Sequence, residues 1–147
     1  MNYTNIEQSK KLLELGLNPG TADFCYRTWM KHDLTPLFVS YTEGISILES
    51  SIYDVSARNK LKMLVPCWSI GALLEVMPKQ IFSEDHIKHY VPTLYIAEKA
   101  SIGYQAMNEF LCIKNGKTLI EAIYDMVVWL LENNYIKKVF VGSYDNN

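Results

Sequence analysis

The segment from Lys117 to Tyr135 constrains the fold most strongly, because it carries the start and stop signals of one long helix. Thr118 is placed to cap its first turn, and Glu121 follows at the spacing of a capping box. Apolar residues then surround most of the helix, most densely around Trp129. A helix that is apolar on nearly every side is a buried helix. We therefore predict that this helix is central to the fold and that Trp129 is buried.

Two shorter segments carry similar helix signals. A helix over Ile6–Leu15 is predicted to begin after a cap at Thr4 or Asn5 and to end at Gly16, which favours the left-handed conformation of a helix end. A second helix is predicted over Ser69–Met77, stopped by the proline that follows. Further helices are predicted over Gly44–Asn59 and Ser83–Tyr90, and strands over Phe24–Met30, Leu37–Thr42, Leu61–Val65, Thr93–Lys99 and Tyr104–Ile113, the last two joined by a turn at Ala100–Gly103.

These elements predict an α+β fold, with a small, mainly antiparallel sheet packed against the long C-terminal helix and the shorter helices. The 147 residues fit a single globular domain spanning 1–147, and 49% hydrophobic against 20% charged residues is typical of a folded chain. The start of the chain lacks the apolar core and cleavage site of a signal peptide, and no apolar run is long enough to span a membrane. We expect a cytoplasmic protein with no membrane association.

The histidines are the first candidates for chemistry. His86 and His89 are three residues apart, so on a helix they would share a face, with Glu84 and Asp85 close by as further ligands. A transition-metal site is one interpretation of this spacing. Ordinary surface histidines are the other, and the missing His-Glu-x-x-His or cysteine-rich spacing favours it.

Cys67 is a candidate nucleophile, because the start of a helix beside it would lower the pKa of its thiol. Its apolar neighbours and the lack of an adjacent histidine favour a packed thiol instead. The three cysteines form no Cys-x-x-Cys pair, which argues against a disulfide framework or a zinc knuckle. Glu121, Asp125 and Glu132 share one side of the last helix with Tyr124, where a solvated face is the simpler interpretation than an acid–base pair.

Arg58, Lys60 and Lys62 form the one sizeable basic cluster, close to Tyr53. Such a cluster is a candidate nucleic-acid site, but the formal net charge of −2 lacks the electrostatic signature of a nucleic-acid-binding domain. Lysines that keep an edge strand soluble explain the cluster equally well. No glycine-rich phosphate loop and no Gly-x-Ser-x-Gly motif is present.

Three phrases, Ser9–Asp23, Pro66–Pro78 and Val128–Ile136, together resemble a family of small uncharacterised proteins from prophage and mobile-element regions of gut bacteria. The resemblance spans nearly the whole chain and implies membership of that family. It implies no activity, ligand or catalytic residue. The part of the chain from Trp29 to Asn59 matches no pattern of the family.

We therefore predict a non-catalytic accessory or interaction protein, encoded by a mobile element, that binds a protein partner or itself and needs no cofactor. The alternative is a nucleic-acid-associated accessory protein that uses Arg58, Lys60 and Lys62. A third hypothesis is a small enzyme that uses Cys67 or the pair His86 and His89. Aromatic side chains make up 12% of the chain, and they anchor interfaces as well as filling cores.

Overall fold

The computed structural model describes residues 2–27, 37–38 and 64–140 of the chain. Within these residues the fold is α+β, as predicted, with three α-helices and two antiparallel sheets. The predicted helix over Gly44–Asn59 lies outside the described residues. The elements in chain order are α1 (Ile6–Leu15), a 3₁₀ turn η1 (Pro19–Thr21), β1 (Phe24–Arg27), β2 (Leu37–Phe38), β3 (Leu64–Cys67), α4 (Ile70–Val76), β4 (Ile81–Phe82), β5 (His89–Ile96), β6 (Ala100–Ala106), β7 (Glu109–Gly116) and α5 (Leu119–Glu132).

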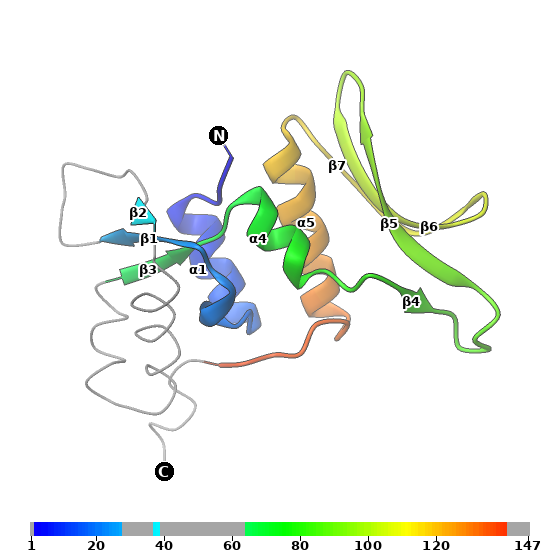
Figure 1. The fold of residues 1–147 in the computed structure, drawn as a ribbon, viewed down its shortest axis with the longest axis horizontal. Coiled ribbons are helices and arrows are strands. Elements are labelled where there is room, and N and C mark those ends of the chain that lie inside the picture. The colour runs from blue at the N-terminus through cyan, green and yellow to red at the C-terminus, as the bar shows by residue number, and fades with distance from the viewer. Residues whose placement is uncertain (1, 28–36, 39–63, 141–147) are drawn as a thin grey trace, which may run out of the picture.

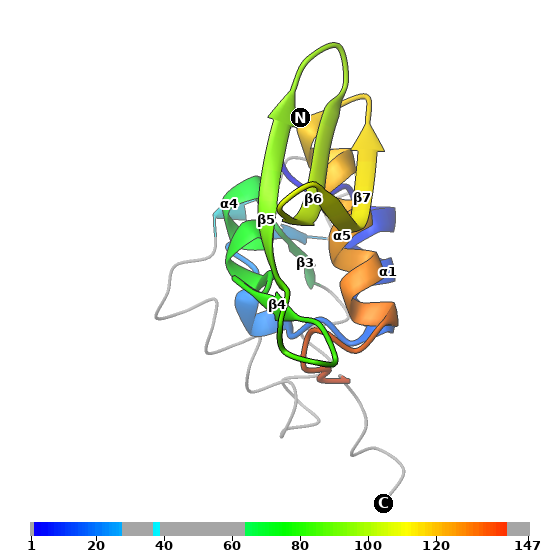
Figure 2. The ribbon, with the colours of Figure 1, turned by 90° about the vertical axis from the view of Figure 1, so that its right-hand side faces the viewer.

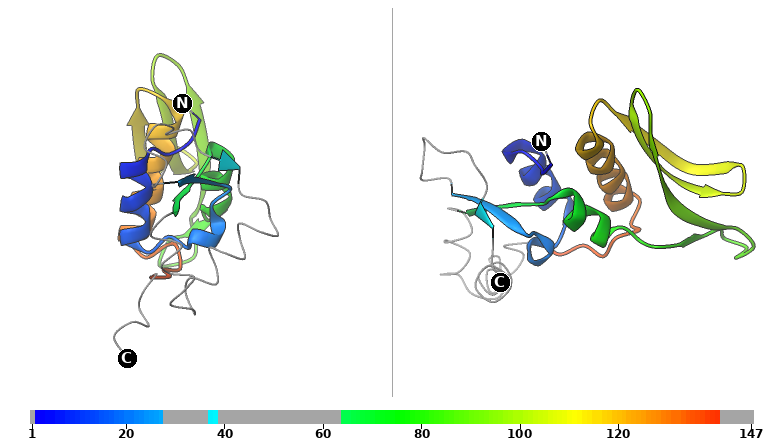
Figure 3. Two further views of the ribbon diagram at one scale, coloured as in Figure 1. Left: turned by 90° about the vertical axis from the view of Figure 1, so that its left-hand side faces the viewer. Right: turned by 45° about the horizontal axis from the view of Figure 1, so that its top comes forward.

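The long helix α5 lies at the centre of the described fold, as its sequence predicted. Figure 1 shows α5 between the four-stranded sheet on one side and α1 and α4 on the other. The same layering is visible in the tilted view of Figure 3. The four-stranded sheet has the order β4-β5-β6-β7, and a smaller sheet of order β2-β1-β3 lies beyond α1 and α4.

The ends of α5 follow its sequence signals closely. The Thr118 side chain accepts a hydrogen bond from the backbone N–H of Glu121, while the Glu121 carboxylate accepts from the backbone N–H of Lys117 at 3.1 Å. The capping box is therefore shifted by one residue from the expected pattern. At the other end Asn134 is left-handed, with φ of 63°, and the Tyr135 N–H donates to the Leu130 carbonyl at 2.9 Å. The helix therefore has a Schellman ending.

Trp129 is only partly buried, so the prediction that it is buried was wrong. The fully buried positions of α5 include Ile123, Met126 and Leu130, which recur at helical spacing and face the core. Trp129 lies to the side of that stripe, and its ring stacks on Tyr135 with a centroid separation of 5.4 Å. The tryptophan that is fully buried is Trp68.

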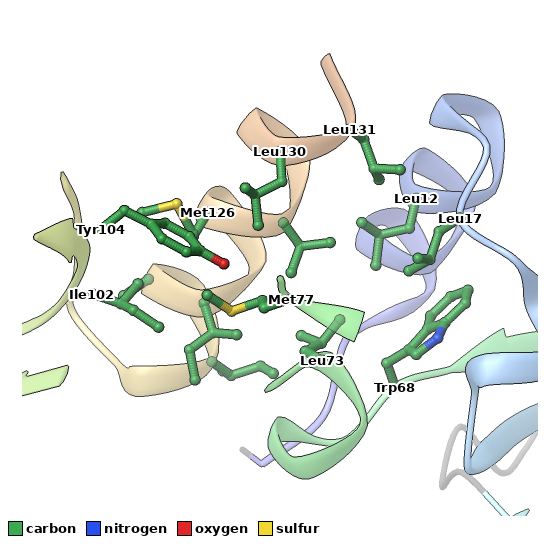
Figure 4. Close-up of a cluster of buried hydrophobic side chains, with 14 of the residues drawn as sticks. Leu12, Leu17, Trp68, Leu73, Met77, Ile102, Tyr104, Met126, Leu130 and Leu131 are labelled. Carbon is green, nitrogen blue, oxygen red and sulfur yellow. The ribbon is translucent and has the colours of Figure 1, made fainter. Parts of the chain in front are cut away.

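Figure 4 shows how side chains from α1, α4, α5 and β6 meet in the main core. The Trp68 ring lies among them, and its indole N–H donates to the Thr21 hydroxyl at 2.9 Å. Tyr104 enters from β6, and its hydroxyl donates to the Pro78 carbonyl at 2.6 Å. Trp68 and Tyr104, the two fully buried aromatic side chains of this core, thus each have a partner for their polar atom.

The two shorter helices begin and end where predicted. Asn5 caps α1, and the N–H groups of Gly16 and Leu17 close its C-terminal end in a Schellman arrangement. Ser69 caps α4, in which Leu73 is fully buried and Leu74 is exposed.

Three predictions between Ser83 and Ile113 were wrong. The predicted helix over Ser83–Tyr90 is a turn followed by β5, because the Asp85 carboxylate accepts from the Ser83 hydroxyl and from a backbone N–H and so closes a local turn. The predicted single strand over Tyr104–Ile113 is two strands separated by a turn at 107–108, and the predicted turn at Ala100–Gly103 belongs to β6.

Candidate functional site

His86 and His89 do not share a helix face, because no helix forms there. His86 lies in the turn before β5 and His89 begins that strand, and both are exposed. Their rings pack beside Phe82, with centroid separations of 6.1 Å for His86 and 4.5 Å for His89. In the part of the chain that the structure describes, no group of three or more His, Cys, Asp or Glu side chains is arranged to hold a metal.

Cys67 is fully buried at the end of β3, where its thiol donates to the Thr4 carbonyl at 3.2 Å. Burial raises the pKa of this thiol to about 11, despite hydrogen bonds from Thr4 and Tyr26 that act in the opposite direction. A thiol that is protonated and shielded from solvent is a poor nucleophile at neutral pH. This environment matches the packed thiol rather than the catalytic one.

Two of the predicted carboxylates do line a cavity. Glu121 and Asp125 meet Tyr124 and Lys99 around a surface cavity of about 590 Å³, while Glu132 is not among the lining residues. Burial raises the pKa of Asp125, and burial followed by the charge of Asp125 raises that of Tyr124. Asp125 nevertheless keeps much of its surface in solvent, and the Glu121 carboxylate is engaged in the helix cap, so neither is set up as the acid or base of a catalytic pair.

The basic cluster of Arg58, Lys60 and Lys62 lies outside the described residues. Its role in nucleic-acid binding therefore stays a prediction.

A different feature dominates the described surface: an apolar patch on the four-stranded sheet. One face of this sheet packs against α5, and Figure 2, which looks onto the other face, shows no described element covering it. Five large side chains of that outer face are each 40–47% exposed. We call this set the outer face; it consists of Phe82, Val91, Tyr95, Phe110 and Ile113.

The strand register places these side chains on one face. Val91 pairs with Gln105, which in turn pairs with Phe110, so the three lie in one row across β5, β6 and β7. Gly103 pairs with Ile113 in the next row along β6. Residues directly opposite one another point to the same side of an antiparallel sheet.

Local contacts hold this surface in place. A Cβ on Gly103 would lie 2.9 Å from the Phe110 ring, so the missing side chain lets that ring lie across the middle strand. Tyr95 meets Phe110 edge to face, with 6.2 Å between ring centroids, and its hydroxyl is within 2.5 Å of the Gln105 side-chain oxygen. The apolar groups are thus held at the surface by neighbours on the same face.

Sequence reasoning missed this face, because it assigned one strand to residues that form β6 and β7. The signal was present in β5, where Val91, Thr93 and Tyr95 alternate with Tyr90 and the other residues of the opposite face. Apolar residues occur on both faces of this strand, so the alternation that marks a half-exposed strand is hidden. Only the position of α5 reveals which face is covered.

No protein-family model, no curated protein and no solved structure matches this chain. The resemblance to proteins of prophage and mobile-element regions therefore stays a prediction from the sequence. None of the helices within the described ranges has the length and apolar character needed to cross a membrane.

Proposed function

We propose that the protein is a non-catalytic interaction protein that binds a protein partner or a second copy of itself through the outer face. The observation that supports this proposal is the gathering of five large apolar side chains, each 40–47% exposed, on one sheet face. An apolar patch on a soluble domain is typical of a binding surface. Encoding by a mobile element is part of the proposal and rests on the sequence resemblance alone.

The size of the outer face indicates what kind of contact it supports. With strands about 4.8 Å apart and residues about 3.4 Å apart along each strand, the five side chains, from Phe82 beside His89 to Tyr95, span a patch of roughly 14 by 20 Å. A stable interface usually buries about 800 Å² on each partner. The outer face alone is too small for that, so neighbouring surface must contribute to a lasting complex.

Substitutions on β5 test the proposal. Val91→Lys and Tyr95→Lys each place a charge in the outer face and leave Gln105 and Ser101, their partners on β6, unchanged. Leu74→Lys, on the exposed side of α4, is the matched control. The tagged variants are compared with the wild type in capture from a lysate of the native host and in analytical ultracentrifugation. We expect both β5 variants to lose a captured partner or the self-association that the control retains.

Two results would overturn the proposal. One is that the β5 variants capture the same proteins and sediment as the wild type does. The other is that Leu74→Lys loses association to the same degree, which would show that added charge alone is responsible.

A further inference from the structure

The outer edge of β7 is the longest open strand edge among the described elements. β7 spans eight residues and pairs with β6 on one side only. Figure 2 shows it at the margin of the sheet, with no described strand beside it. An edge of this kind presents backbone N–H and C=O groups that another chain can pair with.

The other described edges are protected in ways that β7 is not. β4 and β2, which end the two sheets, have two residues each. The part of β5 beyond its short pairing with β4 contains Pro92, and β3 contains Pro66. A proline has no N–H to give to a new strand. β7 contains no proline, and its centre, Phe110–Ile113, is apolar.

We propose that two copies of the chain associate by antiparallel pairing of their β7 edges. The charges of the strand are self-complementary in this arrangement: Glu109 begins it and Lys114 lies near its other end. A twofold axis puts the acidic end of each copy beside the basic end of the other. Parallel pairing would place like charges together, which is unfavourable.

One register of the two β7 strands pairs opposite charges and also pairs side chains that lie on the same face of the sheet. Phe110 and Ile113 both lie on the outer face, and Glu109 and Lys114, opposite Ala106 and Ile102 of β6, both lie on the other side. The irregularity between β6 and β7 at Tyr104 and Gln105 causes this, because it shifts the alternation of β7 by one residue.

Pairing in that register sets Phe110 opposite Ile113 of the second copy and Glu109 opposite Lys114 of the second copy. Each pairing occurs twice because of the twofold axis. The two four-stranded sheets then form one continuous sheet, and the two outer faces become adjacent. This inference goes beyond the proposed function. It gives the chain a second copy as a partner at the β7 edge, and the continuous sheet places two outer faces side by side as one larger apolar surface.

Charge reversal tests the pairing. Sedimentation equilibrium of the wild type is expected to show a concentration-dependent dimer that weakens as salt rises. Glu109→Lys or Lys114→Glu alone turns both cross-copy pairs into like-charge pairs, and we expect the dimer dissociation constant to rise about ten- to hundredfold. The double variant E109K/K114E restores opposite charges across the axis and should recover the dimer.

The double variant is decisive because it restores the charge pairs between copies while it disrupts the charge contacts within each copy. Glu109 forms an ion pair with Lys88 at 2.5 Å, and the charge of Lys114 acts on Asp125. The double variant places like charges at both of these sites, so it cannot recover the dimer by repairing the monomer. Urea denaturation of each variant identifies any that fail to fold.

Cross-linking gives a second readout that tolerates loss of the charges. In a Cys112→Ser background, a mixture of E109C and K114C chains should form disulfide-linked pairs on mild oxidation. Either variant alone should not, because identical positions lie about 17 Å apart in this register. The other two cysteines, Cys25 and Cys67, are buried.

Three results would overturn the inference. The first is a wild-type monomer at all concentrations up to roughly 100 μM, where a weak specific dimer should be visible. The others are a dimer that the charge variants leave unchanged and cross-links between identical positions. These results are distinct from failure of the proposed function. A monomer that still captures a partner through Val91 and Tyr95 would leave that proposal standing. A charge-sensitive dimer with no dependence on the outer face would support the edge pairing alone.

Discussion

Replacing Trp68 by alanine should destabilise the protein much more than replacing Trp129. Trp68 is fully buried in the main core, and its indole N–H donates to Thr21. Its removal leaves a large cavity, which typically costs about 3 to 5 kcal/mol. It also leaves the Thr21 hydroxyl without its donor, which adds about 1 kcal/mol. The sum is a large share of the roughly 5 to 15 kcal/mol that stabilises a domain of this size.

Trp129 lies partly in solvent and stacks on Tyr135 with an interplanar angle of 23°. The stacked pair contributes about 0.5 to 1.5 kcal/mol beyond area burial, and the partly buried ring adds a similar amount. We therefore expect Trp129→Ala to cost about 1 to 3 kcal/mol, toward the lower end because the two contributions share the stacked face of the ring.

Urea denaturation followed by far-ultraviolet circular dichroism measures both variants without relying on tryptophan fluorescence. A double-mutant cycle with Tyr135→Ala should give a coupling energy of about 1 kcal/mol for the stacked rings. If Trp129→Ala lowers the free energy of unfolding as much as Trp68→Ala does, the assignment of Trp68 to the core and Trp129 to its margin is refuted.

Predictions at four further residues are measured by denaturation. Gly16→Ala should cost at least about 1 to 2 kcal/mol, because φ is 99° there. Gly71→Ala should instead stabilise by about 0.5 to 1 kcal/mol, because Gly71 is helical and an added Cβ would make only an ordinary contact, 3.7 Å from the Ser69 hydroxyl oxygen. Tyr104→Phe should cost about 1 to 3 kcal/mol, because it leaves the Pro78 carbonyl unpaired in a partly buried place. Burial raises the pKa of Cys67 from 9.0 to about 11, so its thiol stabilises the fold fully below pH 9. As the pH rises from 9 to 11, the free energy of unfolding should fall by about 2 kcal/mol, because the unfolded chain loses the thiol proton first. Cys67→Ala should show a smaller fall over the same interval.

Helix ends were predictable from the sequence because the signals that set them are local. Asn5, Ser69 and Thr118 each accept a hydrogen bond from the N–H three residues further along the chain, and Gly16 closes a helix through its own backbone. Such contacts depend on residues close in sequence, so the pattern of residue types is sufficient to place them. The remainder of the fold follows from contacts between distant segments.

The turn before β5 shows where local reasoning fails. Ser83 and Asp85 are residues of a helix start, but the same side chains also close a tight turn when the chain continues as a strand. Pairing of His89 with Phe82, and of β5 with β6, decides between the two outcomes. A sequence pattern cannot weigh that pairing against a helix of one or two turns.

The candidate site was hidden for a related reason. Which face of β5 and β7 meets solvent depends on where α5 packs, and both faces of these strands carry apolar residues. The candidates that the sequence did suggest, Cys67 and the pair His86 and His89, are separated in the structure into a buried thiol and an exposed turn. These residues became candidates because of their type alone, and in the structure they do not come together in one site.

Two explanations, a binding interface and simple strand propensity, each account for most of the apolar residues of the outer face. Val91, Tyr95, Phe110 and Ile113 are residue types that favour strands, so pairing within the sheet alone is a sufficient reason for them. Met107 is different. It lies in the turn between β6 and β7, is 94% exposed and has a left-handed φ of 54°, which costs a residue with a side chain about 1 to 2 kcal/mol. Neither burial nor strand propensity favours an exposed methionine there. A binding surface would favour it, because Met107 lies beside the start of the open β7 edge, where a partner chain would contact it.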